Sequence, residues 1–326
     1  MKTKTMTTKK FLSISFLSYG ILLLLTGLLG PRLVEAFYPL PVDQGPSWYF
    51  WQTSATEGIV RASYIIGYLF HQIILWYLLV KRRKQATGVS AGIGLDNLLI
   101  LGVNVVFVLL HLLQTHIWYD GLAKDVPIWT SQGSVIVMLV LVLYMMLPIR
   151  GLFFGKRFTP PVHMMRFIQR WHGMFISWAI VYTFWFHPME GNWGLLSGFL
   201  YMFLLFIQIQ LVGTKMHLNK IWIVLLESFV TIHGTLITVY KHNEIWPMFL
   251  FGFLAMFVFT QAYTWKMRPQ YKWLIVVVYA VSVLLVYGTI RGFEHIYEIT
   301  FIPVALYGGA AALVLIGWIW DRVAKR

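Results

Sequence analysis

Long apolar runs recur along the whole chain, and they limit the possible folds more than any other feature. Residues 135–147 and 273–287 are examples without a single charged side chain. A helix needs about 20 apolar residues to cross the roughly 30 Å core of a bilayer, and lipid offers no partner to free backbone polar groups. A β-barrel would instead show short segments of alternating polarity. The runs therefore predict an all-α integral membrane protein.

Ten such runs can be placed, and the composition agrees with them. The chain is 59% hydrophobic and 12% charged, whereas soluble domains are about 25% charged. The predicted spans are 11–30, 57–80, 96–117, 130–149, 165–187, 192–213, 219–240, 246–265, 273–290 and 299–319. Short polar connections separate them, apart from a longer outer interfacial loop at 31–56. We expect one polytopic domain over residues 1–326, a bundle of about ten transmembrane helices.

The basic residues predict the orientation of the bundle. If the N-terminus is cytoplasmic, 21 of the 26 Lys and Arg residues fall in inner segments and 4 in outer ones, with Arg61 inside a span. Most acidic residues fall on the outer side. This asymmetry follows the positive-inside rule, so both termini are expected in the cytoplasm and the protein in the cell membrane. The net charge of +14 is therefore a topology signal rather than a nucleic-acid footprint.

The first apolar stretch has an alternative interpretation. Residues 34–36 read Val-Glu-Ala, which fits the small-residue pattern of a signal-peptidase site. Cleavage there would leave nine helices in the same orientation. The stretch is long for a signal peptide, and Pro31 and Arg32 interrupt the approach to the site, which favours an uncleaved first span.

Ionisable groups inside the predicted spans indicate function, because polar groups in a bilayer are costly. Counted from the nearest charged boundary at about 1.5 Å per residue, His71 lies near the middle of the membrane. By the same count, His111 and His233 lie in the outer half. Hydrogen bonding to a neighbouring helix is the alternative role for each histidine.

Matched depth predicts a haem site between two of these histidines. The chain has no cysteine, which excludes thiolate metal sites, iron–sulfur clusters and covalently attached haem. Haem b can be held by two neutral imidazoles that face each other inside a helix bundle. His111 and His233 lie at similar depth on spans that run in the same direction. We expect them to bind haem b or another metal, with His71 as the reserve ligand.

A second cofactor site is predicted on the fifth span. His172 lies near its inner end and His187 closes its outer end. Arg61 lies within the second span, one turn after Glu57. We expect Arg61 to pair with Glu57, because i and i+4 side chains are neighbours on a helix, or to contact a bound anion such as a haem propionate.

An outer metal site is the alternative to haem. Four histidines lie at predicted outer ends with carboxylates close by, and the candidate ligands are His116, His187 and Glu190. Imidazole and carboxylate together suit Zn, Fe or Mn. Histidine is also common at membrane interfaces, and that placement alone would explain these residues.

The sequence thus leaves several functional classes open. We expect a membrane redox protein, acting as an oxidoreductase, in which buried histidines hold the cofactor. Its expected electron partner is a quinone or another membrane redox protein. A proton- or metal-coupled transporter would use Glu227, Arg61 and the same histidines. An outer-face metalloenzyme and an assembly factor with packing histidines complete the set. The transporter class lacks paired broken helices in the two halves of the chain.

Overall fold

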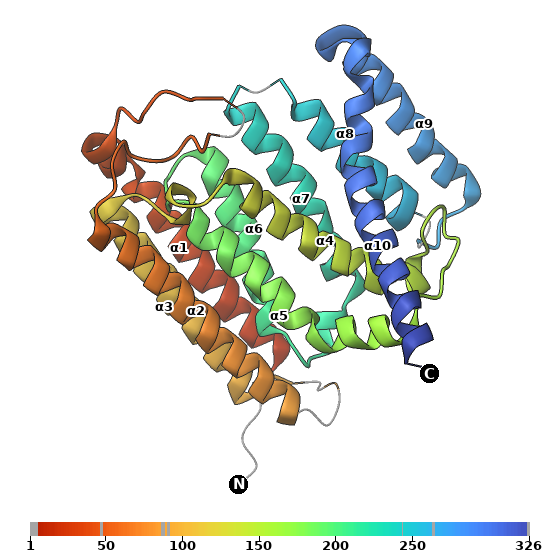
Figure 1. Cartoon of the computed structure of the whole chain (residues 1–326), viewed down its shortest axis with the longest axis horizontal. Coiled ribbons are helices and arrows are strands. Elements are labelled where there is room, and N and C mark those ends of the chain that lie inside the picture. Colours follow the sequence, from red (N-terminus) through yellow and green to blue (C-terminus); the bar gives the residue numbers. More distant parts are fainter. Residues whose placement is uncertain are drawn as a thin grey trace. The chain divides into compact units, whose positions relative to one another are not determined.

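The computed structural model describes residues 6–45, 48–85, 89, 92–242, 244–262 and 265–324. Within these ranges the chain forms ten α-helices and no strand (Figure 1). The helices are α1 (Thr8–Phe37), α2 (Gly58–Gln85), α3 (Leu95–Trp118), α4 (Ile128–Arg150), α5 (Val162–Phe186), α6 (Trp193–Gln210), α7 (Lys220–Tyr240), α8 (Trp246–Met256), α9 (Pro269–Val286) and α10 (Phe301–Val323). The predicted all-α architecture is confirmed.

The helices identify the chain as a multi-pass membrane protein. Eight helical segments in the described ranges are long and apolar enough to cross a bilayer, and a shorter apolar one covers Trp246–Gln261. α9 and α10 also expose large apolar side chains, among them Leu285, Val304 and Ile319. Such surfaces are unfavourable in water and favourable in lipid. The number of ten spans and the position of the termini stay predictions.

The first helix is longer than its predicted span. α1 continues through Pro31 to Phe37, and the backbone N–H of Tyr38 caps it by donating to the carbonyl of Val34 at 3.2 Å. Residues 31–37 are therefore helical, and the outer interfacial loop predicted at 31–56 is wrong over that part. The described residues that follow, 38–45 and 48–57, have no regular secondary structure, and we name this stretch the outer segment after its predicted side.

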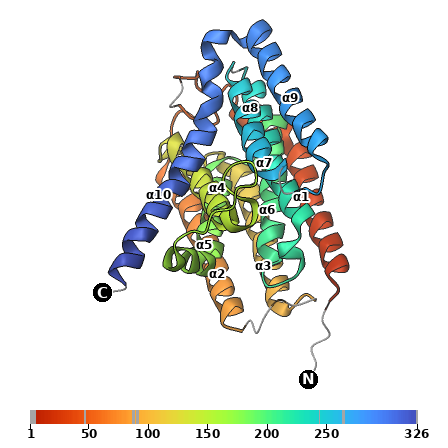
Figure 2. The same cartoon turned by 90° about the vertical axis from the view of Figure 1, so that its right-hand side faces the viewer.

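The chain divides into two compact units. Unit 1 contains Met1–Val135 and Gly173–Leu226, and unit 2 contains Ile136–His172 and Glu227–Arg326. In unit 1, α3 packs against α1, α2 and α6. In unit 2, α8 packs against both α9 and α10 (Figure 2). The sites described below each lie within one unit.

Candidate functional site

A chamber of about 390 Å³ lies inside unit 2. Its walls come from the second half of α4, from α7, from α8 and from Leu306 of α10. Most of the wall is aliphatic or aromatic, because α7 and α8 are apolar on the faces that they turn toward each other. Ligand pockets in proteins have this size and combine an apolar lining with a few polar groups. We name this space the unit 2 chamber.

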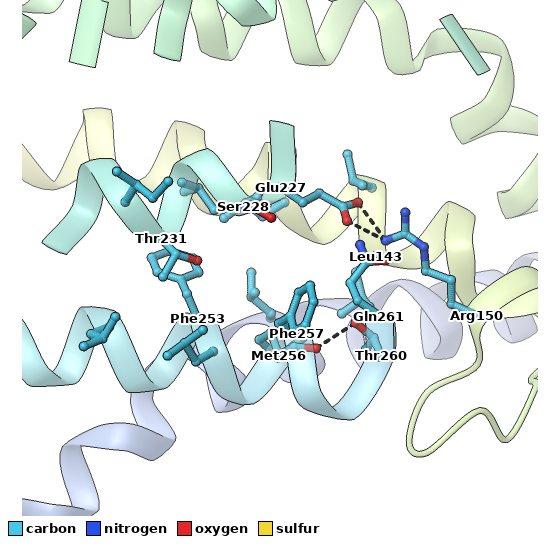
Figure 3. A pocket seen from close by; sticks show the side chains of 17 residues that line it. Leu143, Arg150, Glu227, Ser228, Thr231, Phe253, Met256, Phe257, Thr260 and Gln261 are labelled. Atoms are coloured by element: carbon cyan, nitrogen blue, oxygen red, sulfur yellow. Dashed lines mark hydrogen bonds and ion pairs between the residues drawn. The ribbon is translucent and has the colours of Figure 1, made fainter. Parts of the chain in front are cut away.

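The two charged side chains of the unit 2 chamber lie together at one end (Figure 3). Nη1 of Arg150 donates to both carboxylate oxygens of Glu227, each at 2.7 Å. The side chains are largely buried, with 13% of Arg150 and 20% of Glu227 exposed. A buried pair of this kind is a neutral unit, and removing either partner leaves an uncompensated charge. Thr231 and Phe253 lie toward the other end.

Local helix geometry explains why Arg150 reaches the chamber. Arg150 is the last residue of α4, and Gly151 follows with a φ of +84°. That left-handed conformation commonly ends helices and favours glycine. A cation in the last turn also interacts favourably with the negative end of the helix dipole. Glu227 lies seven residues after Lys220, so it is roughly 10 Å along α7 from that charged end.

A π-helical turn shapes the same polar end. Phe257–Gln261 continues α8 with π-helical geometry, which is rare and often marks functional sites. The turn brings Thr260 and Gln261 beside the Arg150–Glu227 pair (Figure 3). The Thr260 hydroxyl donates to the carbonyl of Met256 at 2.7 Å, so its oxygen can still accept a hydrogen bond.

His71 lies in the core of unit 1 with both ring nitrogens hydrogen-bonded. Its Nε2 lies 2.9 Å from Oδ1 of Asn104, and its Nδ1 accepts from the indole N–H of Trp185 at 3.2 Å. The ring stacks on Phe107 with centroids 4.6 Å apart. Since the indole can only donate, the neutral ring carries its proton on Nε2. A haem iron at His71 would have to displace one of these partners.

His111 also lies against Trp185, with ring centroids 4.4 Å apart. Its Nε2 lies 2.8 Å from the carbonyl oxygen of His187, and its Nδ1 lies 3.0 Å from Oε1 of Gln114. Both nitrogens of this ring therefore lie within hydrogen-bond distance of protein oxygens, and the single N–H of a neutral ring donates to one of them. His233 belongs to unit 2. The predicted haem between His111 and His233 requires His111 to release one partner, and this prediction stays open.

The other predicted cofactor residues have separate surroundings. Nδ1 of His172 lies 2.8 Å from the carbonyl of Gln169 on its own helix. Nδ1 of His187 lies 2.5 Å from the hydroxyl of Tyr49. His172 belongs to unit 2 and His187 to unit 1.

Arg61 has a different partner from the predicted one. Its Nε donates to Oδ1 of Asp125 at 2.8 Å, while the carbonyl of Glu57 accepts the backbone N–H of Arg61 at 3.1 Å. The predicted side-chain pair with Glu57 is wrong, because η1 (Leu122–Lys124) packs against α2 and brings Asp125 to the guanidinium. The general expectation of a paired Arg61 is met.

The three predicted ligands of an outer metal have protein partners of their own. Nδ1 of His116 lies 2.8 Å from the carbonyl of Leu112. Glu190 is 3% exposed and accepts from the hydroxyls of Tyr38, at 2.8 Å, and Tyr119, and from Nδ2 of Asn192 at 2.7 Å. Among the described residues, no three His, Asp or Glu side chains come together in a way that could hold a metal ion.

A second buried carboxylate anchors the outer segment of unit 1. Asp120 accepts from the backbone N–H of Thr53 at 2.8 Å and from the hydroxyls of Thr53 and Thr56, both at 2.6 Å. Nearby, burial raises the pKa of Tyr49 well above its ordinary value, and the charges of Glu190 and Asp120 raise it further. Tyr49 therefore stays protonated and donates to His187. These contacts fix residues 49–56 to the ends of α3 and α5.

One signal for this polar interior is visible in the sequence. Asn97, Asn104 and His111 follow each other at intervals of seven residues, which places them on one face of a helix. All three are fully buried in α3. Nδ2 of Asn97 donates to the carbonyl of Gln210 at 2.6 Å, so this face of α3 is bonded to α6 as well as to α2. Hydrogen bonds between helices are a common role of such buried polar residues.

A hydrolase motif also occurs in the chain without its usual context. Residues 88–92 read Gly-Val-Ser-Ala-Gly, a match to G-x-S-x-G. In hydrolases this motif follows a strand and opens a helix. Here the preceding element is α2, which ends at Gln85, and most of the motif lies outside the described residues. It carries no functional assignment.

Comparison with known proteins adds no relative. No protein-family model, curated protein or solved structure matches the chain. Any functional assignment therefore depends on the residues themselves.

Proposed function

We propose that the protein binds a lipid-soluble amphiphile in the unit 2 chamber, with the polar head of the ligand against Arg150 and Glu227. The strongest support is the distribution of apolar and charged side chains along the chamber. The lining is mostly apolar, and its two charged side chains lie together at one end. An amphiphile has the same division between tail and head, so one molecule can satisfy both parts of the chamber.

The electrostatics of the polar end favour a head without net charge. Arg150 and Glu227 neutralise each other at 2.7 Å. An anionic head would compete with Glu227 for the guanidinium, and a cationic head would compete with Arg150 for the carboxylate. Breaking such a pair in a poorly solvated site is costly. A neutral head can add hydrogen bonds while the pair stays intact.

The expected position in the bilayer agrees with a membrane ligand. By the predicted orientation in the cell membrane, Arg150 and Glu227 lie toward the cytoplasmic side, and the apolar part of the chamber extends toward the membrane centre. A lipid-soluble molecule can therefore reach the site without leaving the bilayer. This proposal keeps the quinone partner expected from the sequence and does not depend on haem or metal.

A chamber-filling substitution tests the proposal. Thr231→Phe puts a ring into the chamber, and Thr289→Phe makes the same exchange at an exposed position of unit 2. Both variants and the native protein are purified in the same detergent, and bound lipids are extracted and measured by mass spectrometry. We expect one amphiphile in near-stoichiometric amount with native protein and with Thr289→Phe, and a severalfold loss with Thr231→Phe. Equal recovery from all three would overturn the proposal.

A further inference from the structure

The Arg150–Glu227 pair can serve a head that accepts hydrogen bonds and one that donates them. Within the described residues, Nη1 is the one guanidinium nitrogen of Arg150 with a hydrogen bond. An arginine has five N–H donors, and a carboxylate offers about four lone-pair positions. The pair therefore has donors left on Arg150 and acceptor positions left on Glu227, and both residues line one end of the chamber (Figure 3).

The walls next to this end suit a flat ring. Phe257 lines the chamber here from the π-helical turn, and Phe253 of α8 lines it farther from the pair. Aromatic side chains pack favourably against other rings in offset or edge-on arrangements. The remaining lining is mostly aliphatic, which suits a hydrocarbon tail. A ligand with a polar-substituted ring as its head and an apolar tail matches this order of charged, aromatic and aliphatic walls.

From these observations, and on the basis of the proposed function, we infer that the amphiphile is a quinone with an isoprenoid or alkyl tail, bound in both its oxidised and its reduced form. A quinone carbonyl accepts a hydrogen bond from Arg150. A quinol hydroxyl donates to Glu227. Both forms are neutral, so neither disrupts the ion pair. Few other membrane amphiphiles change from acceptor to donor without gaining charge.

Three probes with the same tail separate recognition of the head from binding of the tail. Decyl-benzoquinone presents carbonyls, decyl-hydroquinone presents hydroxyls, and decylbenzene presents neither. Binding of each is measured by titration of the full-length protein in lipid nanodiscs, with empty nanodiscs as the partition control. We expect the native protein to bind the first two about tenfold more tightly than decylbenzene, as for one hydrogen bond to a charged group.

A double variant shows whether the pair is responsible. Arg150→Met with Glu227→Met removes both charges together, an exchange that buried pairs tolerate better than the loss of one partner. The variant should bind all three probes alike, at the native affinity for decylbenzene. A double variant that keeps the native preference for the quinone would overturn the inference.

The outcomes for native protein separate the inference from the proposed function. If native protein binds decylbenzene as tightly as decyl-benzoquinone, the chamber takes apolar ligands and the quinone inference is wrong. If none of the three probes binds above the empty nanodisc, the proposed function fails together with the inference. If the quinone binds tightly and the quinol does not, recognition by Glu227 is wrong.

Discussion

Arg150 holds Glu227 through a single nitrogen, with Nη1 at 2.7 Å from each carboxylate oxygen. The two residues lie 77 positions apart in the chain, at the end of α4 and in the third turn of α7. Their pairing gives the unit 2 chamber a polar end that carries two charges and no net charge. The ligand proposed for the chamber follows from this neutrality.

The Arg150–Glu227 pair is expected to contribute to the free energy of unfolding. Arg150→Met leaves Glu227 mostly buried without its cation, and we expect a loss of about 3–5 kcal/mol in the free energy of unfolding. The double exchange of Arg150 and Glu227 to Met should recover most of that loss. Arg61→Met is the control, since 48% of the Arg61 side chain is exposed and exposed pairs contribute about 0–1 kcal/mol. Unfolding in detergent, followed by tryptophan fluorescence, measures all three. A double variant as unstable as Arg150→Met would contradict the prediction.

The helices could be predicted from the sequence, and the partners of their polar residues could not. Hydropathy located the helices to within a few residues at most ends, because lipid imposes one length and one secondary structure. α1 departs most, since Pro31 predicts a boundary and lies inside the helix. Proline is often tolerated in membrane helices, so it is a weak stop signal there.

Site residues depend on packing that depth alone does not determine. His111 and His233 share a predicted depth, but the contacts of His111 are with Gln114 and His187. Arg61 could pair with Glu57 one turn away or with Asp125. The packing of η1 against α2 brings Asp125 to the guanidinium. Glu227 was recognised as a buried acid, whereas its partner Arg150 resembled an ordinary positive-inside residue. Sequence spacing cannot show which of these alternatives the tertiary contacts select.

The orientation of the protein can be tested by cysteine labelling, because the native chain has no cysteine. Asp43 lies in the outer segment, and Lys84 and Lys156 lie at predicted inner positions; all three are exposed. In intact cells we expect an impermeant maleimide to label Asp43→Cys and to leave Lys84→Cys and Lys156→Cys unlabelled until the membrane is opened. Labelling of either lysine position from outside would show that the predicted orientation is wrong.

Haem binding is open to a direct spectroscopic test. His71 and His111 each have both ring nitrogens within hydrogen-bond distance of protein groups, and an axial ligand needs one nitrogen for iron. We therefore expect no Soret band above background in purified protein, and no change on reduction with dithionite. A Soret band that is present in native protein and lost in both His111→Ala and His233→Ala would establish the bis-histidine haem predicted from the sequence.

Gly67 provides a test of the packing around Trp185. A Cβ added at Gly67 would lie 2.2 Å from Cη2 of Trp185. The indole has two contacts that hold it in place, because its N–H donates to His71 at 3.2 Å and its ring lies against His111.

Overpacking of this kind costs about 1–3 kcal/mol, and it exceeds the gain of up to about 1 kcal/mol from placing alanine in a helix. We expect Gly67→Ala to lower the melting temperature of the protein in detergent. Gly102→Ala is the matched control, since a Cβ at Gly102 on α3 meets no atom of the described residues within 4 Å. That variant should melt at the native temperature or slightly above it. Equal melting of both variants would show that the indole can shift, and that the contact between Trp185 and His71 is looser than the geometry indicates.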